Sequence, residues 1–260
     1  MIFAIAVGAS RYAGDMTGIA VVTGASSGIG AATARALSEN YTVYCVARRV
    51  ERIEALAQEI GGVALPCDIT NVEQVARLAA QIGDRVDLLV NNAGGALGQD
   101  PLAIDDLTRW ERMYEINVMG AARVTQALLP AIRASKGTII FVTSTAAESP
   151  YEGGGGYCGV KSAERSMAGA LRLELVGEPI RVCEISPGMV HTEEFSLVRF
   201  DGDQARADAV YAGVPEPLLA EDIADAIAWI ASRPAHVNID RLVVRPLAQA
   251  ANYKVFRTPA

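Results

Sequence analysis

Residues 19–37 restrict the possible folds of this chain more than any other stretch. An apolar run (Ile-Ala-Val-Val-Thr, 19–23) leads directly into the glycine-rich Thr-Gly-Ala-Ser-Ser-Gly-Ile-Gly (23–30) and then into an alanine-rich, helix-like segment (31–37). The lack of polar alternation is typical of a strand covered on both faces in a parallel sheet. Strand, glycine turn and helix in this order predict a phosphate-binding turn, because the backbone can approach a pyrophosphate and the helix N-terminus offers free N–H groups. The alternative is a flexible loop that only turns the chain.

The rest of the chain repeats this alternation of strands and helices. Further strands are predicted at 42–46, 63–65, 86–90, 138–142, 180–185 and 239–245. The helices between them are predicted at 50–60, about 71–82, 105–134, 155–177 and 220–232. Seven strands alternating with helices predict an α/β protein with a single-domain Rossmann fold, a doubly wound seven-stranded parallel sheet with helices on both faces. We expect this domain to span 19–260 and residues 1–18 to form an N-terminal extension.

Two local predictions complete this outline. Thr70 and Glu73 have the spacing of a capping box, which places the start of a helix at about residue 71. The polar, glycine-bearing segment from residue 193 to about Pro217 has weak periodicity and is interpreted as a mobile lid.

Charge and residue counts exclude several classes of function. The formal net charge is −7 and no basic tract occurs, which argues against nucleic acid or an anionic membrane as a partner. The 4 cysteines form no C-x-x-C pair, as expected for reduced, mostly buried thiols in a cytoplasmic protein. Only 2 histidines occur, far apart, so we expect neither a metal site nor a Ser-His-Asp hydrolase. No apolar run reaches the roughly 18 residues of a membrane span.

The end of the second predicted strand indicates which dinucleotide is bound. In a dinucleotide fold this position faces the adenosine ribose, and an acidic residue there binds the 2′-hydroxyl of NAD. Here Ala47 occupies the position and Arg48 and Arg49 follow, a pattern suited to the 2′-phosphate of NADP. The alternative is a solvated basic turn before the next helix.

Three further polar positions follow predicted strands or interrupt a helix. Asp68 lies just past the third strand, where it could accept a hydrogen bond from adenine or serve as a turn aspartate. The segment Asn-Asn-Ala-Gly-Gly (91–95) allows close approach of a flat ring or ribose, while its amides could tie neighbouring strands. Asn117 is disfavoured inside a helix, so either its side chain or a local kink matters, or it is a tolerated surface residue.

A tyrosine and a lysine at helical spacing are the strongest catalytic candidates. Tyr157 and Lys161 are four residues apart and would share one helix face, with Ser144 delivered to the same sheet edge by the fifth strand. The ordinary pKa of a tyrosine phenol is about 10. An ammonium beside the phenol favours the phenolate, which lowers this pKa and allows proton exchange nearer neutral pH. By itself this spacing also occurs on many solvated helix faces.

Taken together, these motifs resemble the short-chain dehydrogenase/reductase family from Ile19 to the end of the chain. The resemblance implies that Tyr157 is the general acid/base, that Lys161 lowers its pKa and holds the nicotinamide ribose, that Ser144 binds the substrate carbonyl and that Asn117 positions a relay water. It implies NADP(H) as cofactor, bound by Gly24, Ser26, Ser27, Gly28, Ile29, Gly30, Arg48, Arg49, Asp68, Ile69, Asn92, Ala93, Gly94, Tyr157, Lys161, Pro187, Gly188, Val190 and Thr192.

Within the family the chain resembles NADP-dependent serine/3-hydroxy acid dehydrogenases, through Ala-Leu-Gly (96–98), Glu-Phe-Ser (194–196), Val-Arg-Phe (198–200) and Pro-Ala-His-Val-Asn-Ile (234–239). This implies hydride transfer between NADP(H) and a small 3-hydroxy acid, and a homotetramer that uses the long helices. The chain departs from the family pattern in the acidic residues near the cleft and lid and in the four consecutive glycines before Tyr157. The acidic residues disfavour a carboxylate substrate unless a cation such as Arg199 compensates; Arg199 is otherwise a solvated lid residue.

Two alternatives to a hydroxy acid dehydrogenase follow. The first is a carbonyl reductase for a sugar or a biosynthetic ketone. The second is an NADP-binding redox sensor without catalysis, which would be free to lose Ser144, Tyr157 or Lys161, although all three are present.

Overall fold

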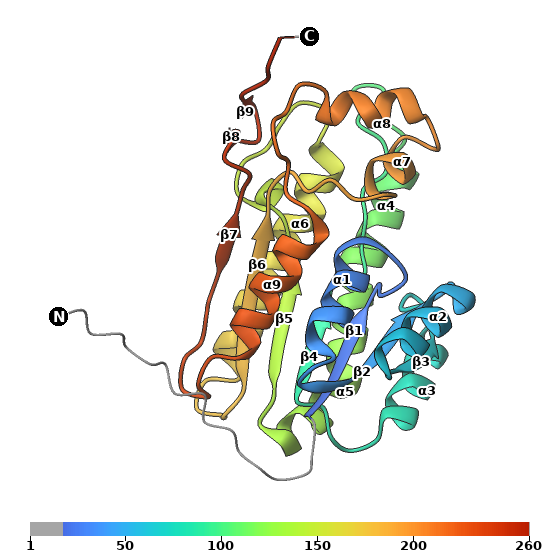
Figure 1. Ribbon diagram of the computed structural model, residues 1–260, viewed down its shortest axis with the longest axis vertical. Helices are drawn as coiled ribbons and strands as arrows, with labels where there is room; N and C mark the ends of the chain where they lie inside the picture. The colour runs from blue at the N-terminus through green and yellow to red at the C-terminus, as the bar shows by residue number, and fades with distance from the viewer. Residues whose placement is uncertain (1–17, 260) are drawn as a thin grey trace, which may run out of the picture.

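The fold is a seven-stranded parallel sheet with helices on both faces (Figure 1). A computed structural model describes residues 18–259, and the rest of the predicted N-terminal extension lies outside them. The strands are β1 (Gly18–Thr23), β2 (Tyr41–Ala47), β3 (Val63–Pro66), β4 (Leu88–Asn91), β5 (Thr138–Val142), β6 (Arg181–Pro187) and β7 (Leu242–Val244), in the order β3-β2-β1-β4-β5-β6-β7. The predicted fold class is confirmed. The order reverses between β1 and β4, and open α/β sheets bind ligands at such a reversal.

Burial on both faces explains the apolar strand sequences. On one face pack α1 (Gly28–Leu37), α2 (Val50–Ile60) and α9 (Ala220–Ala231), and on the other α3 (Val72–Ile82), α5 (Ala121–Ser135) and α6 (Gly155–Glu174). Successive residues of β1 alternate between the two cores, Val22 facing the first and Val21 the second. Both are fully buried, so no position of the strand centre tolerates a polar side chain.

The long helical segment predicted at 105–134 is divided by a π-helical turn. α4 (Leu107–Tyr114) is followed by the π-turn Glu115–Gly120 and then by α5. A π-turn widens the helix by one residue per turn and changes which backbone carbonyls are free. Asn117 lies in this turn and is buried, so the expectation of a local distortion at this residue is confirmed and the surface alternative is wrong.

The predicted Thr70–Glu73 capping box is wrong by one residue. The N-cap of α3 is Asn71, whose side-chain oxygen accepts a hydrogen bond from the Gln74 N–H at 2.8 Å. Thr70 instead donates its hydroxyl hydrogen to Asp68 Oδ1 at 2.8 Å. A nearby carboxylate is the stronger acceptor, and it draws Thr70 away from the helix N-terminus.

The segment after β6 contains structure that weak periodicity did not reveal. Two short helices, α7 (Phe195–Arg199) and α8 (Gln204–Tyr211), lie with α4 beyond the carboxyl ends of the strands (Figure 1). A C-terminal hairpin of β8 (Gln249–Ala251) and β9 (Lys254–Val255) lies at the same end. None of the helices among residues 18–259 combines the length and apolarity needed to cross a bilayer.

Candidate active site

One cavity of about 720 Å³ lies at the carboxyl edge of the sheet. Every residue that the sequence suggested for catalysis or cofactor binding lines it, although these residues come from segments spread between Gly24 and Thr192. The short helices α7 and α8 and the C-terminal hairpin contribute further walls, including Phe195, Arg199 and Asn252. Parallel strands deliver all of their carboxyl ends to one edge, which is why the distant motifs meet.

The glycine turn between β1 and α1 leaves room for a phosphate. Gly24 adopts a left-handed φ of 69°, and a Cβ atom on Gly30 would lie 2.2 Å from the Gly24 carbonyl oxygen. Neither position therefore accepts a larger residue. The turn opens at the N-terminus of α1, where unpaired N–H groups favour an anion. These features fit the pyrophosphate of a dinucleotide.

Amide and hydroxyl groups join the glycine turn to the end of β4. The Thr23 hydroxyl accepts hydrogen bonds from the N–H groups of Asn92 and Ala93, both at 3.0 Å, and Asn92 Nδ2 donates to the Thr23 carbonyl at 2.9 Å. The amide of Asn92 thus ties neighbouring strands, which was one of the two roles considered from the sequence. The adjacent backbone of Ala93 and Gly94 lines the cavity.

Arg49 is anchored in the wall of the cavity by three side chains. Its guanidinium donates to Ser26 Oγ at 2.9 Å, to Ser27 Oγ at 2.8 Å and to Glu194 Oε1 at 2.7 Å. Arg52, which the sequence analysis did not single out, contacts the same Glu194 oxygen at 2.7 Å. Its place two residues past the start of the helix that follows Arg48 and Arg49 was the only available signal. Two arginines therefore converge on one anion, a geometry that a phosphate also satisfies.

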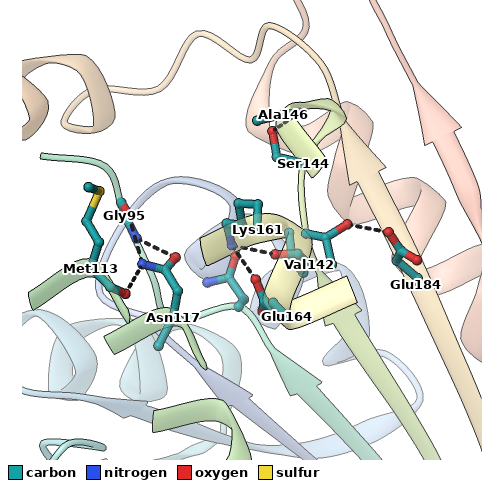
Figure 2. A network of polar contacts seen from close by, with 12 residues as sticks. Gly95, Met113, Asn117, Val142, Ser144, Ala146, Lys161, Glu164 and Glu184 are labelled. Carbon is teal, nitrogen blue, oxygen red and sulfur yellow. Dashed lines mark hydrogen bonds and ion pairs between the residues drawn. The ribbon is translucent and has the colours of Figure 1, made fainter. Parts of the chain in front are cut away.

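The π-turn places Asn117 against the loop after β4. Asn117 Nδ2 donates to the carbonyl oxygens of Met113 at 2.8 Å and Gly95 at 3.0 Å, and Asn117 Oδ1 accepts from the Gly95 N–H at 3.1 Å (Figure 2). A Cβ atom on Gly94 would lie 2.4 Å from Asn117 Oδ1. The side chain is thus fully bonded and fixes the loop that lines the cavity.

Ser144 and Tyr157 reach the cavity from β5 and α6. Ser144 follows β5 at the start of a short 3₁₀ turn, and its hydroxyl accepts a hydrogen bond from the Ala146 N–H at 3.1 Å (Figure 2). Tyr157 lies in the first turn of α6, half-buried, with its ring centroid 5.9 Å from that of Phe195. A Cβ atom on Gly156 would lie 2.8 Å from Trp110, so this glycine lets α6 pack closely on α4.

Lys161 is buried beside a carboxylate that the sequence motifs did not include. Its ammonium donates to Glu164 Oε2 at 2.7 Å and to the Val142 carbonyl at 3.1 Å (Figure 2). Burial lowers the pKa of Lys161, but the charges of Glu164 and Tyr157 and the hydrogen bond to Glu164 together raise it by more, so the pKa lies above its ordinary value. The i, i+3 spacing of Lys161 and Glu164 was readable, but the burial of Glu164 was not.

Arg199 is a buried cation that lines the cavity near Tyr157. Its guanidinium donates to the Gly98 carbonyl at 2.9 Å and to the Tyr151 hydroxyl at 3.0 Å. The guanidinium carbon lies 5.7 Å from the centroid of the Tyr157 ring. Among residues 18–259 no Asp or Glu forms an ion pair with Arg199. The interpretation as a solvated lid arginine is therefore wrong.

The site can exchange a proton and bind a dinucleotide in the same cavity. A tyrosine and a charged lysine one turn apart on α6 suit proton transfer to or from an alcohol, and the glycine turn suits the pyrophosphate of a hydride carrier. Fold and site together define a dinucleotide-dependent oxidoreductase. A family model described as short chain dehydrogenase matches residues 18–200, and the chain belongs to this family.

Comparison with known proteins identifies similar relatives across nearly the whole chain. An uncharacterized oxidoreductase of Mycobacterium tuberculosis is 53% identical over 90% of this chain and 92% of its own. A serine 3-dehydrogenase of Rhizobium radiobacter is 43% identical over 93% of this chain and 99% of its own. The closed form of a serine dehydrogenase in complex with NADP+ is 36% identical, with a TM-score of 0.86 over 92% of this chain and 100% of its own. The predicted resemblance to serine/3-hydroxy acid dehydrogenases is confirmed.

Glu194 makes the stability of the protein depend on pH in the acidic range. Its hydrogen bond with Arg49 holds the pKa of Glu194 at about 2, below the value of 4.5 for a free carboxyl. Because the folded-state pKa is the lower one, the stabilisation is present above about pH 4.5 and is lost as the pH falls toward 2. We predict that Glu194→Gln lowers the unfolding free energy by about 1–2 kcal/mol at pH 6 and by less at pH 3.

Urea denaturation of wild type and variant at a series of pH values measures this difference. Glu193→Gln is the matched control, because Glu193 is exposed and forms none of the ion pairs found among residues 18–259. A stability difference for Glu194→Gln that does not change between pH 6 and pH 3 contradicts the prediction.

Proposed function

We propose that this oxidoreductase uses NADP(H) to interconvert a secondary alcohol and a carbonyl in a small 3-hydroxy acid. The observation that carries the substrate class is Arg199. It is buried, lines the same cavity as Tyr157 and lacks an acidic partner in the described part of the chain. A buried guanidinium without a counter-ion favours an anion from solution, and a planar carboxylate matches its fork of donors.

The acidic residues near the cleft do not oppose a carboxylate substrate. Glu148 is paired with Arg245 at 2.8 Å and Arg241 at 3.7 Å. Glu194 is held by the two arginines of the cofactor end. The charges of Glu148 and Glu194 are thus compensated, whereas that of Arg199 is not. Glu152 and Glu193 are exposed and do not line the cavity.

The positions of the side chains support a catalytic role for each of them. Tyr157 gives or takes the proton of the substrate oxygen, and Lys161, charged and one helical turn away, stabilises the phenolate. Ser144 donates a hydrogen bond to the same oxygen and favours the charge that develops there. Asn117 orders the loop after β4 and a relay water. The bound nicotinamide supplies or accepts the hydride.

The preference for NADP(H) rests on the arginines after β2. Arg48 and Arg49 line the cavity where the adenosine ribose of a dinucleotide would lie, and Ala47 replaces the acid that would select NAD. The guanidinium of Arg49 binds the carboxylate of Glu194, so it is oriented to bind an anionic group such as a 2′-phosphate.

We further propose that the enzyme works in the cytoplasm as a homotetramer. All four cysteines are free and buried, as in proteins of a reducing compartment. The helices α4 and α6 expose large apolar side chains, among them Leu107 at 55% and Leu173 at 77%, which association with further copies would cover.

Turnover with a substrate panel tests the function. We expect reduction of NADP, followed by the absorbance of the reduced nicotinamide, with serine, allo-threonine, 3-hydroxybutyrate or 3-hydroxyisobutyrate. Tyr157→Phe is expected to lower kcat by about 10²-fold or more, because the variant lacks the acid/base hydroxyl, while it still binds NADPH. Turnover confined to neutral ketones or sugars overturns the hydroxy acid assignment, a preference for NAD overturns the cofactor assignment, and an undiminished Tyr157→Phe activity overturns the mechanism.

Arg199→Met tests the carboxylate site separately. We expect KM for a hydroxy acid to rise about 10- to 100-fold, since a charge-assisted hydrogen bond is lost, while KM for a neutral secondary alcohol changes little. Tyr151→Phe is the control for packing, because it removes only the hydroxyl that bonds Arg199. An equal loss for charged and neutral substrates contradicts the role of Arg199.

Sedimentation at micromolar concentration tests the oligomer. We expect a species of four chains of 27.4 kDa each. Leu107→Glu with Leu173→Glu should shift it toward smaller species, because a charge would be buried at the interface. A wild-type protein that is only monomeric refutes the homotetramer.

A further inference from the structure

Glu164 is a buried carboxylate with no place in the roles assigned so far. It lies on α6 one turn after Lys161, is only 1% exposed and faces the interior rather than solvent. Its Oε2 atom lies 2.7 Å from Lys161 Nζ (Figure 2). Acidic residues are almost never fully buried unless they are paired. The ion pair with Lys161 therefore accounts for the burial of Glu164.

The ammonium of Lys161 needs a counter-charge at this depth. Lys161 is 4% exposed, and its other protein acceptor is the neutral carbonyl of Val142. An unpaired ammonium in such surroundings loses much of its hydration and tends to give up its proton. A neutral Lys161 could not stabilise the phenolate of Tyr157. Glu164 supplies the charge that keeps the lysine protonated.

The same contact fixes the direction of the ammonium. Glu164 and Val142 take two of the three ammonium hydrogens from the interior side. Lys161 Nζ also approaches the loop after β4, where a Cβ atom on Gly94 would lie 3.6 Å away. The third hydrogen is thus left for the cavity, which Lys161 and Gly94 both line.

We propose that Glu164 is a positioning residue that keeps Lys161 charged and holds its ammonium toward the cofactor side of the cavity. The inference deepens the function proposed above and rests on the roles given there to Tyr157 and Lys161. Glu164 itself touches neither substrate nor cofactor in this scheme. It acts through Lys161.

Two further titratable groups face the Lys161–Glu164 pair, Tyr157 and Glu184. Tyr157 and Lys161 share α6 with Glu164, and Glu184 approaches from β6, where its Oε1 accepts a hydrogen bond from the Thr143 hydroxyl at 2.7 Å (Figure 2). Burial raises the pKa of Glu164, the charge of Lys161 opposes this, and Glu184 adds to the rise. The net pKa is above its ordinary value, so the Lys161–Glu164 ion pair is complete only on the alkaline side of that pKa.

The pH profile of Glu164→Gln is the first test. Gln keeps the shape of the side chain but removes the charge, so Lys161 should lose its proton at lower pH. We expect the alkaline limb of kcat/KM for alcohol oxidation to move down by about 1 pH unit or more. Glu164→Asp retains the charge and should keep the limb near its wild-type position, with a lower kcat. Glu184→Gln is the matched control, a carboxylate of similar burial bonded to Thr143, and should shift the limb by less than half as much.

A cofactor-free unfolding experiment separates this inference from the proposed function. We expect Glu164→Gln to lower Tm by several degrees, and by less than half of that in a Lys161→Met background, because the unpaired charge is then absent. If Glu164→Gln alone does not fold, the proposal requires that Lys161→Met restore folding. Equal effects in both backgrounds, or a folded Glu164→Gln whose alkaline limb stays in place, overturns the proposal. If Glu164→Gln is less destabilising in the Lys161→Met background but Tyr157→Phe is fully active, the Lys161–Glu164 interaction stands and the proposed catalytic mechanism is rejected.

Discussion

The parallel sheet is covered on both faces, and this constraint organises the rest of the molecule. Residues such as Val21 and Val22 are buried against opposite helix layers, so a polar group on either face needs a buried partner, as Glu184 has in Thr143. Solvent-accessible polar side chains gather instead where the strands end. The carboxyl edge therefore receives the glycine turn, the amides after β4, Ser144 and the segment after β6, and one cavity is lined by them all.

Small residues let these elements approach closely enough to share that cavity. A side chain at Gly30 would collide with the backbone of Gly24, one at Gly94 with Asn117, and one at Gly156 with Trp110. Each contact joins two different elements of the site. Gly155 and Gly156 are thus explained by the packing of α6 on α4.

Charge pairing differs among the cations around the cavity. Arg49 and Arg52 converge on Glu194, and Lys161 is balanced by Glu164. Arg199 is buried without an acidic partner in the described residues, with aromatic rings around it. Of these cations, Arg199 is therefore the one whose charge the described residues leave uncompensated.

The sequence by itself determined the elements whose signals are local. Strand β5 was predicted with its bounds unchanged, and the glycine turn and the Tyr157–Lys161 spacing were readable because a strand period, a turn and a helix period each span only a few residues. The α3 cap was misplaced because Asp68 competes for Thr70, and α7 and α8 were missed because short helices carry little periodicity. Arg49 and Glu194 are 145 residues apart, and Arg199 bonds a carbonyl 101 residues away. Only the tertiary structure decided these partners and the burial of Glu164, because the electrostatics of a side chain depend on which distant segments exclude water from it.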